Sequence, residues 1–139
     1  MQSKNERTLL ILKPDAVSRK IEDDIKDCFE SNGLRITAQK RIALSKKEVA
    51  DFYSVHSKME FFDDLCAYMS SAPVIVLVAE GIDAVTKARN LIGDYDPLLA
   101  APETIRGKFG ISKMENTIHG SDSTKNAANE IAFFFRGIE

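Results

Sequence analysis

The sequence has only two cysteines and no long apolar run. Cys28 and Cys66 lie far apart and outside any CxxC spacing, so neither a cysteine metal site nor a disulfide is indicated, and both are predicted to be reduced, packed thiols. The apolar stretches at residues 9–12 and 73–79 are far shorter than the ~20 residues that a membrane-spanning helix needs. With no signal peptide visible, we expect a cytoplasmic protein without a membrane partner.

An excess of charge of one sign is also lacking, since 19 Lys and Arg stand against 21 Asp and Glu for a formal net charge of −2. Such a balance indicates neither a nucleic-acid-binding protein nor a membrane-surface protein. The sequence likewise contains neither a GxxxxGK phosphate loop nor a protein-kinase signature. Any anionic ligand must therefore be held by a local cluster of scattered positive side chains.

What is present suffices for one compact fold, because 139 residues with 44% hydrophobic content can bury a continuous core. We expect a single domain over residues 1–139. Apolar periodicity predicts the following elements in chain order: a strand at 8–12, a helix at 21–32, a strand at 34–44, helices at 45–53 and 60–69, a strand at 73–79, a helix at 83–92, a strand at 117–119 and a helix at 123–135.

Residues 94–115 show no sustained period and are predicted to form a long loop before the last strand. The order of elements predicts an α+β fold of the ferredoxin-like type, a four-stranded antiparallel sheet with helices on one face. Ser45 and Glu48 fit a capping box, and Asp83 is predicted to cap the helix that follows it. The strand at 73–79 is apolar without alternation, which predicts cover on both faces, and the three phenylalanines at 133–135 are expected to be largely buried.

The segment NTIHGSD places His119 at the end of a short strand, followed by a glycine and two small polar residues. Gly120 lets the chain turn without a side chain beside the imidazole, while Ser121 offers an oxygen near the next helix. Glu130 on that helix is placed to accept a ring N–H, which leaves the other ring nitrogen free to attack. An ordinary histidine, with a pKa of about 6.5, is mostly neutral at cytoplasmic pH. His119 is thus predicted to be a nucleophile, whereas His56 lacks this context and is given no catalytic role.

This motif resembles N-x-x-H-G-S-D, the active-site signature of the nucleoside diphosphate kinases. Residues 13–17 are similar to the KPDAV element of that family. Further matches occur in order at Tyr53, 61–62, Arg89, 104–107 and 130–131. The similarity covers roughly residues 7–135, nearly the whole chain. It implies a ping-pong exchange in which a nucleoside triphosphate phosphorylates His119 and a nucleoside diphosphate later removes the phosphoryl group.

The resemblance also implies how phosphates are held. Lys13, Arg89 and Arg106 would bind phosphate oxygens and neutralise the charge that spreads in the transition state. Tyr53 would add a hydroxyl donor. Mg²⁺ would be the cofactor, held by the nucleotide phosphates with no direct protein ligand, and Asp122 is the candidate for a contact through water.

Contacts to the rest of the nucleotide follow from the same resemblance. Asn116 and Lys13 would contact the ribose, and Phe61 would stack on the base with weak selectivity, because every base has a π face. The catalytic candidates are His119, Glu130, Lys13, Tyr53 and Ser121. The nucleotide-binding candidates are Lys13, Phe61, Arg89, Arg106, Asn116 and Tyr95.

Several positions depart from the family pattern, and they cluster in and beside the long loop. Tyr95 and Asp96 stand where a Thr-Asn pair is common, so the threonine hydroxyl that would help hold a phosphate is replaced by a longer side chain. Glu103 replaces a usual glycine and Lys108 a usual aspartate. If Glu103 faces the site, its charge would oppose that of the nucleotide; if it pairs with Lys108, the loop keeps its shape.

Two alternatives stay open from the residues alone. One is a catalytically weakened relative that binds nucleotides as a binding or regulatory protein. The other is an RNA-binding module, because residues 106–110 faintly resemble a strand motif of RNA-recognition domains, although we expect no specific nucleic-acid partner. The family resemblance also implies a homo-oligomer, either a tetramer or a hexamer.

Overall fold

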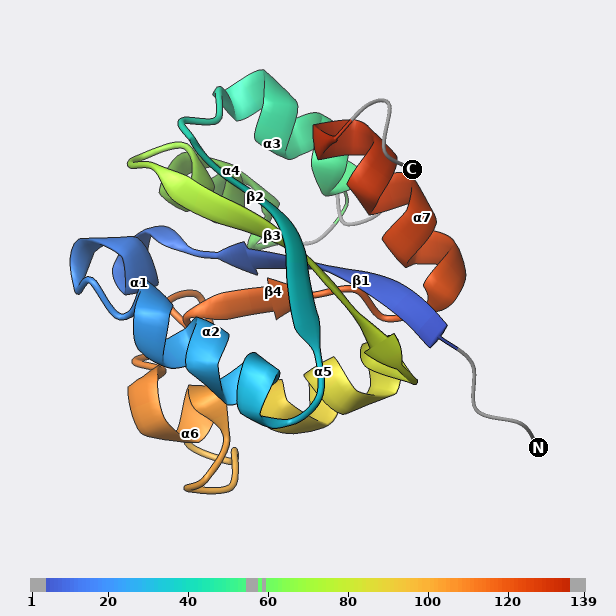
Figure 1. Cartoon of the computed structure of the whole chain (residues 1–139). Coiled ribbons are helices and arrows are strands. Elements are labelled where there is room, and N and C mark those ends of the chain that lie inside the picture. Colours follow the sequence, from blue (N-terminus) through green and yellow to red (C-terminus); the bar gives the residue numbers. More distant parts are fainter. Residues whose placement is uncertain (1–4, 55–57, 59, 136–139) are drawn as a thin grey trace.

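The computed structural model describes residues 5–54, 58 and 60–135, and its elements follow the predicted order (Figure 1). The strands are β1 (Asn5–Leu12), β2 (Arg35–Ile42), β3 (Val74–Ile82) and β4 (Ile118–Gly120). The helices are α1 (Pro14–Ser18), α2 (Glu22–Ser31), α3 (Lys46–Phe52), α4 (Phe62–Met69), α5 (Ala84–Ile92), α6 (Ile105–Phe109) and α7 (Thr124–Phe134). His56 lies outside the described residues.

The strands form a four-stranded antiparallel sheet in the order β2-β3-β1-β4. β1 and β3 are central and pair along their whole length. The short β4 adds to the other edge of β1, with His119 opposite Ile11. The predicted α+β arrangement is confirmed, and it sets the end of β1 beside the start of β4.

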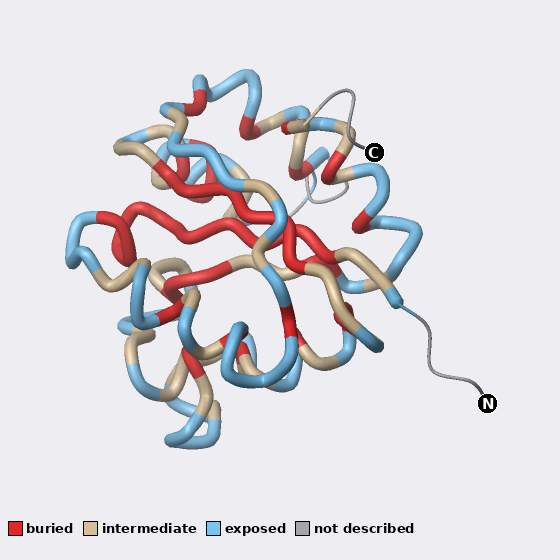
Figure 2. Tube along the Cα trace, in the orientation of Figure 1, coloured by how far each residue is buried: buried red, intermediate tan, exposed pale blue. Residues whose placement is uncertain are grey.

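Helices cover both faces of the sheet, so the prediction of helices on one face is wrong (Figure 1). Helices α1, α2, α5 and α6 pack on one face, and α3, α4 and α7 pack on the other. The reason is visible in β1, where Leu10 and Leu12 belong to the first core while Leu9 and Ile11 belong to the second, all four fully buried. A strand that is apolar on both sides needs apolar cover on both sides. Figure 2 shows the buried strands between two partly exposed helical layers.

Local capping signals had mixed outcomes. The capping box is confirmed, because the Glu48 backbone N–H donates to Ser45 Oγ at 3.0 Å and the Ser45 N–H donates to Glu48 Oε1 at 2.9 Å. The capping role of Asp83 is wrong, since this residue has a left-handed backbone with φ 52° and its side chain makes no capping bond. Instead, Glu6 of β1 accepts the Val85 N–H at 3.3 Å, so a neighbouring strand supplies the cap.

The long loop and the phenylalanine run were each only partly predicted. The loop contains α6, which is too short to produce a visible period. Thr104 is the N-cap of this helix, and its hydroxyl accepts the Gly107 N–H at 3.1 Å. Phe134 is buried, but Phe133 is 38% exposed, which corrects the expectation that all three phenylalanines are largely buried. Consecutive residues on a helix point in directions about 100° apart, so three in a row cannot all face one core.

Both cysteines are free thiols, as predicted. Burial raises the pKa of the Cys28 and Cys66 thiols, so both stay protonated near neutral pH. Within the described ranges, no helix combines the length and the apolar character needed to cross a membrane.

Candidate active site

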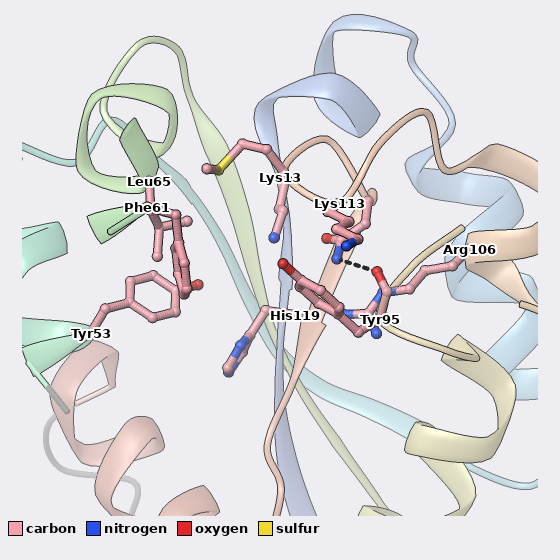
Figure 3. A pocket seen from close by; sticks show the side chains of 10 residues that line it. Lys13, Tyr53, Phe61, Leu65, Tyr95, Arg106, Lys113 and His119 are labelled. Carbon is pink, nitrogen blue, oxygen red and sulfur yellow. Dashed lines mark hydrogen bonds between the residues drawn. The ribbon is translucent and has the colours of Figure 1, made fainter. Parts of the chain in front are cut away.

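The candidate site forms where the end of β1 meets the start of β4. Leu12 pairs with Ile118, and the chain just beyond is tied by the Lys13 N–H, which donates to the Thr117 carbonyl at 2.9 Å. A cavity of about 410 Å³ opens beside this junction (Figure 3). It is lined by Lys13, Tyr53, Phe61, Leu65, Tyr95, Arg106, Lys113, Met114, Asn116 and His119.

A second cavity of about 300 Å³ adjoins the first and shares Tyr53, Tyr95, Arg106 and His119 with it. The second cavity is also lined by Phe52, Arg89, Gly120, Asp122, Asn126 and Glu130. His119 therefore lies where the two cavities meet. Every sequence-predicted site residue lines one or both cavities except Ser121, which is fully buried.

The imidazole of His119 is held from one side. Its Nε2 lies 3.0 Å from Glu130 Oε1, and the same carboxylate oxygen accepts the Ser121 hydroxyl at 2.8 Å. The Leu9 N–H of β1 donates to Ser121 Oγ at 3.1 Å, which fixes the serine in turn. Because a carboxylate only accepts, the neutral ring must carry its proton on Nε2. Nδ1 then keeps a lone pair that is free for nucleophilic attack.

Arg106 is the most firmly anchored cation of the site. Its Nη1 donates to the Gly93 carbonyl at 3.1 Å and its Nη2 to the Ile118 carbonyl at 2.8 Å. Among the described residues, the buried Arg106 Nε has no hydrogen-bond partner. Burial, and then the neighbouring Arg89, lower the pKa of Arg106 to about 10, so the guanidinium stays charged at neutral pH. Arg89 is exposed in the last turn of α5.

Lys13 extends from the end of β1 and is almost fully buried, with 7% of its surface exposed. Burial, and to a smaller extent the charge of Arg106, lowers the pKa of Lys13 to about 8. The charge of Asp15 acts in the opposite direction and raises it. A buried cation that repels another cation is costly to keep charged unless an anion approaches. Lys13 and Arg106 together therefore favour an anionic ligand in the cavity.

Asn116 and Tyr95 form part of one wall. Asn116 Nδ2 donates to the Tyr95 carbonyl at 3.0 Å, while the buried Asn116 Oδ1 lacks a partner within the described part of the chain. The Tyr95 ring is 54% exposed and projects into the cavity (Figure 3). Its long side chain therefore reaches the space where the family pattern has a threonine.

The opposite wall carries aromatic and apolar side chains. Tyr53 and Phe61 stand there with Leu65, across the cavity from Tyr95 (Figure 3). Tyr53 is buried, and burial together with the Glu130 charge raises the pKa of its phenol, which keeps the hydroxyl protonated as a donor. The Tyr53 and His119 rings meet edge to face with centroids 5.8 Å apart.

Sequence reasoning missed three residues that line the first cavity, as well as Phe52 and Asn126 of the second. Leu65, Lys113 and Met114 line the first cavity with the predicted residues. Leu65 follows Phe61 by one helical turn, so i, i+4 spacing was a usable signal for it. Lys113 and Met114 lie in the aperiodic segment before Asn116, where no local pattern indicated their direction.

Side chains that could bind a metal ion directly are few at the candidate site. Across the part of the chain that the structure describes, no three His, Cys, Asp or Glu side chains gather as metal ligands would. Asp122 is exposed beside the second cavity, and its carboxylate accepts the Asn126 side-chain amide. Asp122 is thus a carboxylate beside the second cavity that a metal ion could approach.

A ring nitrogen held in one tautomer, in an open cavity that it shares with a buried lysine and a half-buried arginine, suits phosphoryl transfer to a side chain. The fold and the site are thus those of a phosphotransferase. The family model that matches residues 6–139 is described as nucleoside diphosphate kinase. The chain belongs to the nucleoside diphosphate kinase family.

Similarity to individual members extends over nearly the whole chain. The nucleoside diphosphate kinase of a Nitratiruptor species is 55% identical over 130 residues, which cover 94% of this chain and 95% of that protein. The enzyme of Campylobacter hominis is 54% identical over 134 residues, covering 96% and 98%. A crystal structure of the Aquifex aeolicus nucleoside diphosphate kinase superposes with a TM-score of 0.95 at 42% identity, covering 98% and 99%.

These similarities confirm the predicted family, fold and enzyme class, a kinase that acts on nucleotides. They favour the enzyme over a binding or regulatory relative. The resemblance to an RNA-recognition strand has no structural basis, because residues 106–109 belong to helix α6 and Gly110 is its C-cap. The predicted roles of individual site residues stay predictions.

Proposed function

We propose that the chain transfers the terminal phosphoryl group of a nucleoside triphosphate to a nucleoside diphosphate through a phosphohistidine at His119. The observation that carries the proposal is the 3.0 Å contact between His119 Nε2 and Glu130, which leaves Nδ1 free where the two cavities meet. The Nδ1 lone pair forms the N–P bond as the bond to the β-phosphate oxygen breaks and the diphosphate leaves. The second half of the cycle is the reverse reaction with a different diphosphate.

The cationic side chains act on the phosphates. Lys13 and Arg106 are proposed to neutralise the charge of the equatorial oxygens, and Arg89 to bind a phosphate from the rim of the second cavity. Tyr53 donates its protonated hydroxyl. Support for these roles comes from the burial of Lys13 and the partial burial of Arg106 beside one open cavity, since cations shielded from water interact strongly with anions.

The rest of the nucleotide is proposed to occupy the larger cavity. Phe61 stacks on the base, Asn116 binds the ribose with Lys13, and Tyr95 contacts a phosphate or sugar from the mouth. The unpartnered Asn116 Oδ1 in the described region supports this placement, because a ribose hydroxyl would supply the missing donor. Mg²⁺ is the proposed cofactor, bound by the phosphates, with Asp122 contacting it through water.

Three wider proposals accompany this function. The chain is proposed to be a single domain over residues 1–139, in accord with the family match that extends over residues 6–139. A homo-oligomer, tetramer or hexamer, is proposed because β2 is an edge strand whose backbone groups can pair with another chain. A cytoplasmic location is proposed from the two free thiols, which suit a reducing compartment.

The central proposal is tested by a label-and-chase experiment. Incubation with γ-labelled ATP and Mg²⁺ is expected to place an acid-labile, alkali-stable phosphate on the protein, and CDP or GDP is expected to remove it. His119→Ala should abolish the label, while His56→Ala, which changes the other histidine, should keep it. Label on the His119→Ala variant, or transfer only when donor and acceptor are bound together, would refute the phosphohistidine mechanism.

A further inference from the structure

A buried carboxylate lies directly behind the candidate site. Asp15 is 6% exposed, and both of its carboxylate oxygens are engaged. Oδ2 accepts the Thr117 hydroxyl at 3.1 Å and pairs with Arg19 Nη2 at 3.2 Å, and Oδ1 accepts the Tyr68 hydroxyl in a short hydrogen bond. The Asp15 N–H in turn donates to the Tyr68 oxygen at 3.0 Å. Such a saturated buried carboxylate specifies one local arrangement.

These bonds join three segments that are distant in sequence and adjacent at the site. Asp15 lies in the first turn of α1 just after Lys13, Tyr68 belongs to α4, and Thr117 precedes His119 on the way into β4. Tyr68 and Thr117 are separated from Asp15 by 53 and 102 positions, respectively. Helix α4 also carries Leu65 of the cavity wall. The Asp15 carboxylate is therefore the point where the three segments are fixed relative to one another.

Thr117 has an unusual backbone that needs such support. It is a fully buried, β-branched residue with φ 78°, a backbone conformation that is unfavourable for residues other than glycine. Three hydrogen bonds hold it: the Lys13 N–H donates to its carbonyl at 2.9 Å, its hydroxyl donates to Asp15 Oδ2 at 3.1 Å, and Arg19 Nη2 donates to the same hydroxyl oxygen at 3.4 Å. The direction in which β4 leaves this residue decides where His119 lies.

We propose that Asp15 is a positioning residue for phosphoryl transfer, which holds Lys13 and the His119 strand in register through Thr117 and Tyr68. This inference rests on the function proposed above and deepens it. Asp15 does not reach the cavity itself, since it is absent from the lining of both cavities and its oxygens are occupied by Thr117, Tyr68 and Arg19.

The same carboxylate supports the charge of Lys13. Burial and Arg106 of α6 lower the pKa of Lys13, and Asp15 is the group that opposes them. The other titratable or charged groups that share the first cavity with Lys13 are Tyr53, Tyr95, Lys113 and His119. None of these is an anion at neutral pH by its ordinary chemistry. Removing the Asp15 charge should therefore make Lys13 lose its proton at lower pH.

Three conservative variants test the proposal. Asp15→Asn removes the charge, Thr117→Val removes one hydroxyl while keeping β-branching, and Tyr68→Phe removes the other hydroxyl. Each is expected to slow phosphorylation of His119 at saturating ATP by roughly tenfold, because each removes either the buried charge or one of the hydrogen bonds made to it. Thr117→Ser, which keeps the hydroxyl, should restore most of the rate. Ile25→Val, a fully buried change in the α2 core, is the control for lost stability alone.

The pKa of Lys13 distinguishes the proposed role of Asp15 from a purely structural one, which would leave this pKa unchanged. It is measured from amine-labelling rates across pH by mass spectrometry. Asp15→Asn should lower this pKa, whereas Thr117→Val and Ile25→Val should leave it at the wild-type value. The double variant Asp15→Asn with Thr117→Val should lose less than the product of the single losses. This labelling needs no turnover, so it stays informative if His119 proves not to be the phosphate carrier.

An unchanged Lys13 pKa in Asp15→Asn, together with rates that match Ile25→Val at equal stability, would overturn the proposal. Full additivity of Asp15→Asn and Thr117→Val would also overturn it. If Asp15→Asn does not fold, the single-turnover rates of Thr117→Val and Tyr68→Phe test the positioning role instead. Wild-type rates in both variants would contradict that role.

Discussion

The two ends of the site differ in how many of their polar groups find hydrogen-bond partners within the protein. At the histidine end, His119, Ser121 and Glu130 satisfy one another at 2.8–3.0 Å. At the cation end, Arg106 Nε and Asn116 Oδ1 are buried without partners among the described residues. Lys13 is also buried there, with its pKa depressed to about 8.

This difference separates two tasks. The nucleophile must be oriented before any substrate arrives, and hydrogen bonds within the protein can do that. The charge on phosphates exists only in the bound state, so the groups that neutralise it gain their partners from the ligand. Substitutions at the histidine end should therefore change the rate of phosphorylation, and those at the cation end should change binding as well.

The largest effect is expected from Arg106. Arg106→Ala should lower kcat/KM by roughly 100-fold or more, because it removes a desolvated charge and leaves the Gly93 and Ile118 carbonyls without their donor. Arg106→Lys should recover only part of the loss, since an ammonium cannot reproduce the planar fork. Steady-state kinetics with ATP and a diphosphate measure both. A Lys variant with full activity would mean that charge alone matters at this position.

Glu130→Gln tests the histidine end of the site, in contrast to Arg106 at the cation end. We expect the rate of His119 phosphorylation to fall by roughly 10- to 100-fold with little change in nucleotide affinity, because the proposed role of Glu130 is to orient the ring through the contact with Nε2. Rapid-quench labelling gives the rate, and titration with a non-hydrolysable nucleotide gives the affinity. Equal losses in the phosphorylation rate and in nucleotide affinity would contradict the division of tasks between the histidine end and the cation end.

The pH dependence of Lys13 gives two trends of opposite sign. Its pKa of about 8 in the folded protein lies below the ordinary 10.5, so from pH 8 to 10.5 the unfolded chain holds more protons. The free energy of unfolding should gain a contribution from Lys13 as pH rises through that window. Phosphate affinity should move the other way and fall about five- to tenfold between pH 7 and 9. Denaturant melts and nucleotide titrations at each pH would separate the trends, and a flat affinity profile would contradict the role of Lys13.

The smallest effect is expected at Glu103, a departure from the family pattern. The side chain is exposed and absent from the lining of both cavities, so it faces neither cavity. Glu103→Gln should change kcat/KM by less than about twofold, within the range of ordinary surface substitutions. A clear gain in nucleotide affinity would show that its charge reaches the site through solvent.

The elements of this fold could be predicted because their signals are local. The Ser45–Glu48 capping box and the apolar runs of β1 and β3 depend on neighbours in sequence, and each appeared where expected. Predictions failed where a partner came from elsewhere: Glu6 of β1 caps α5 in place of Asp83, and helices from three later segments cover the second face of the sheet.

The sequence by itself was enough to predict a nucleophile at His119 from the residue types around it, and, through the family resemblance, phosphate-binding cations at Lys13 and Arg106. Only the tertiary structure decided which side chains meet. Asp15 carries no local sign of its role, since its partners Tyr68 and Thr117 come from 53 and 102 positions away. A motif consists of residues adjacent in sequence, so its chemistry can be predicted from the sequence. Hydrogen-bond partners and cavity walls depend on how the sheet and its two helical layers bring distant segments together.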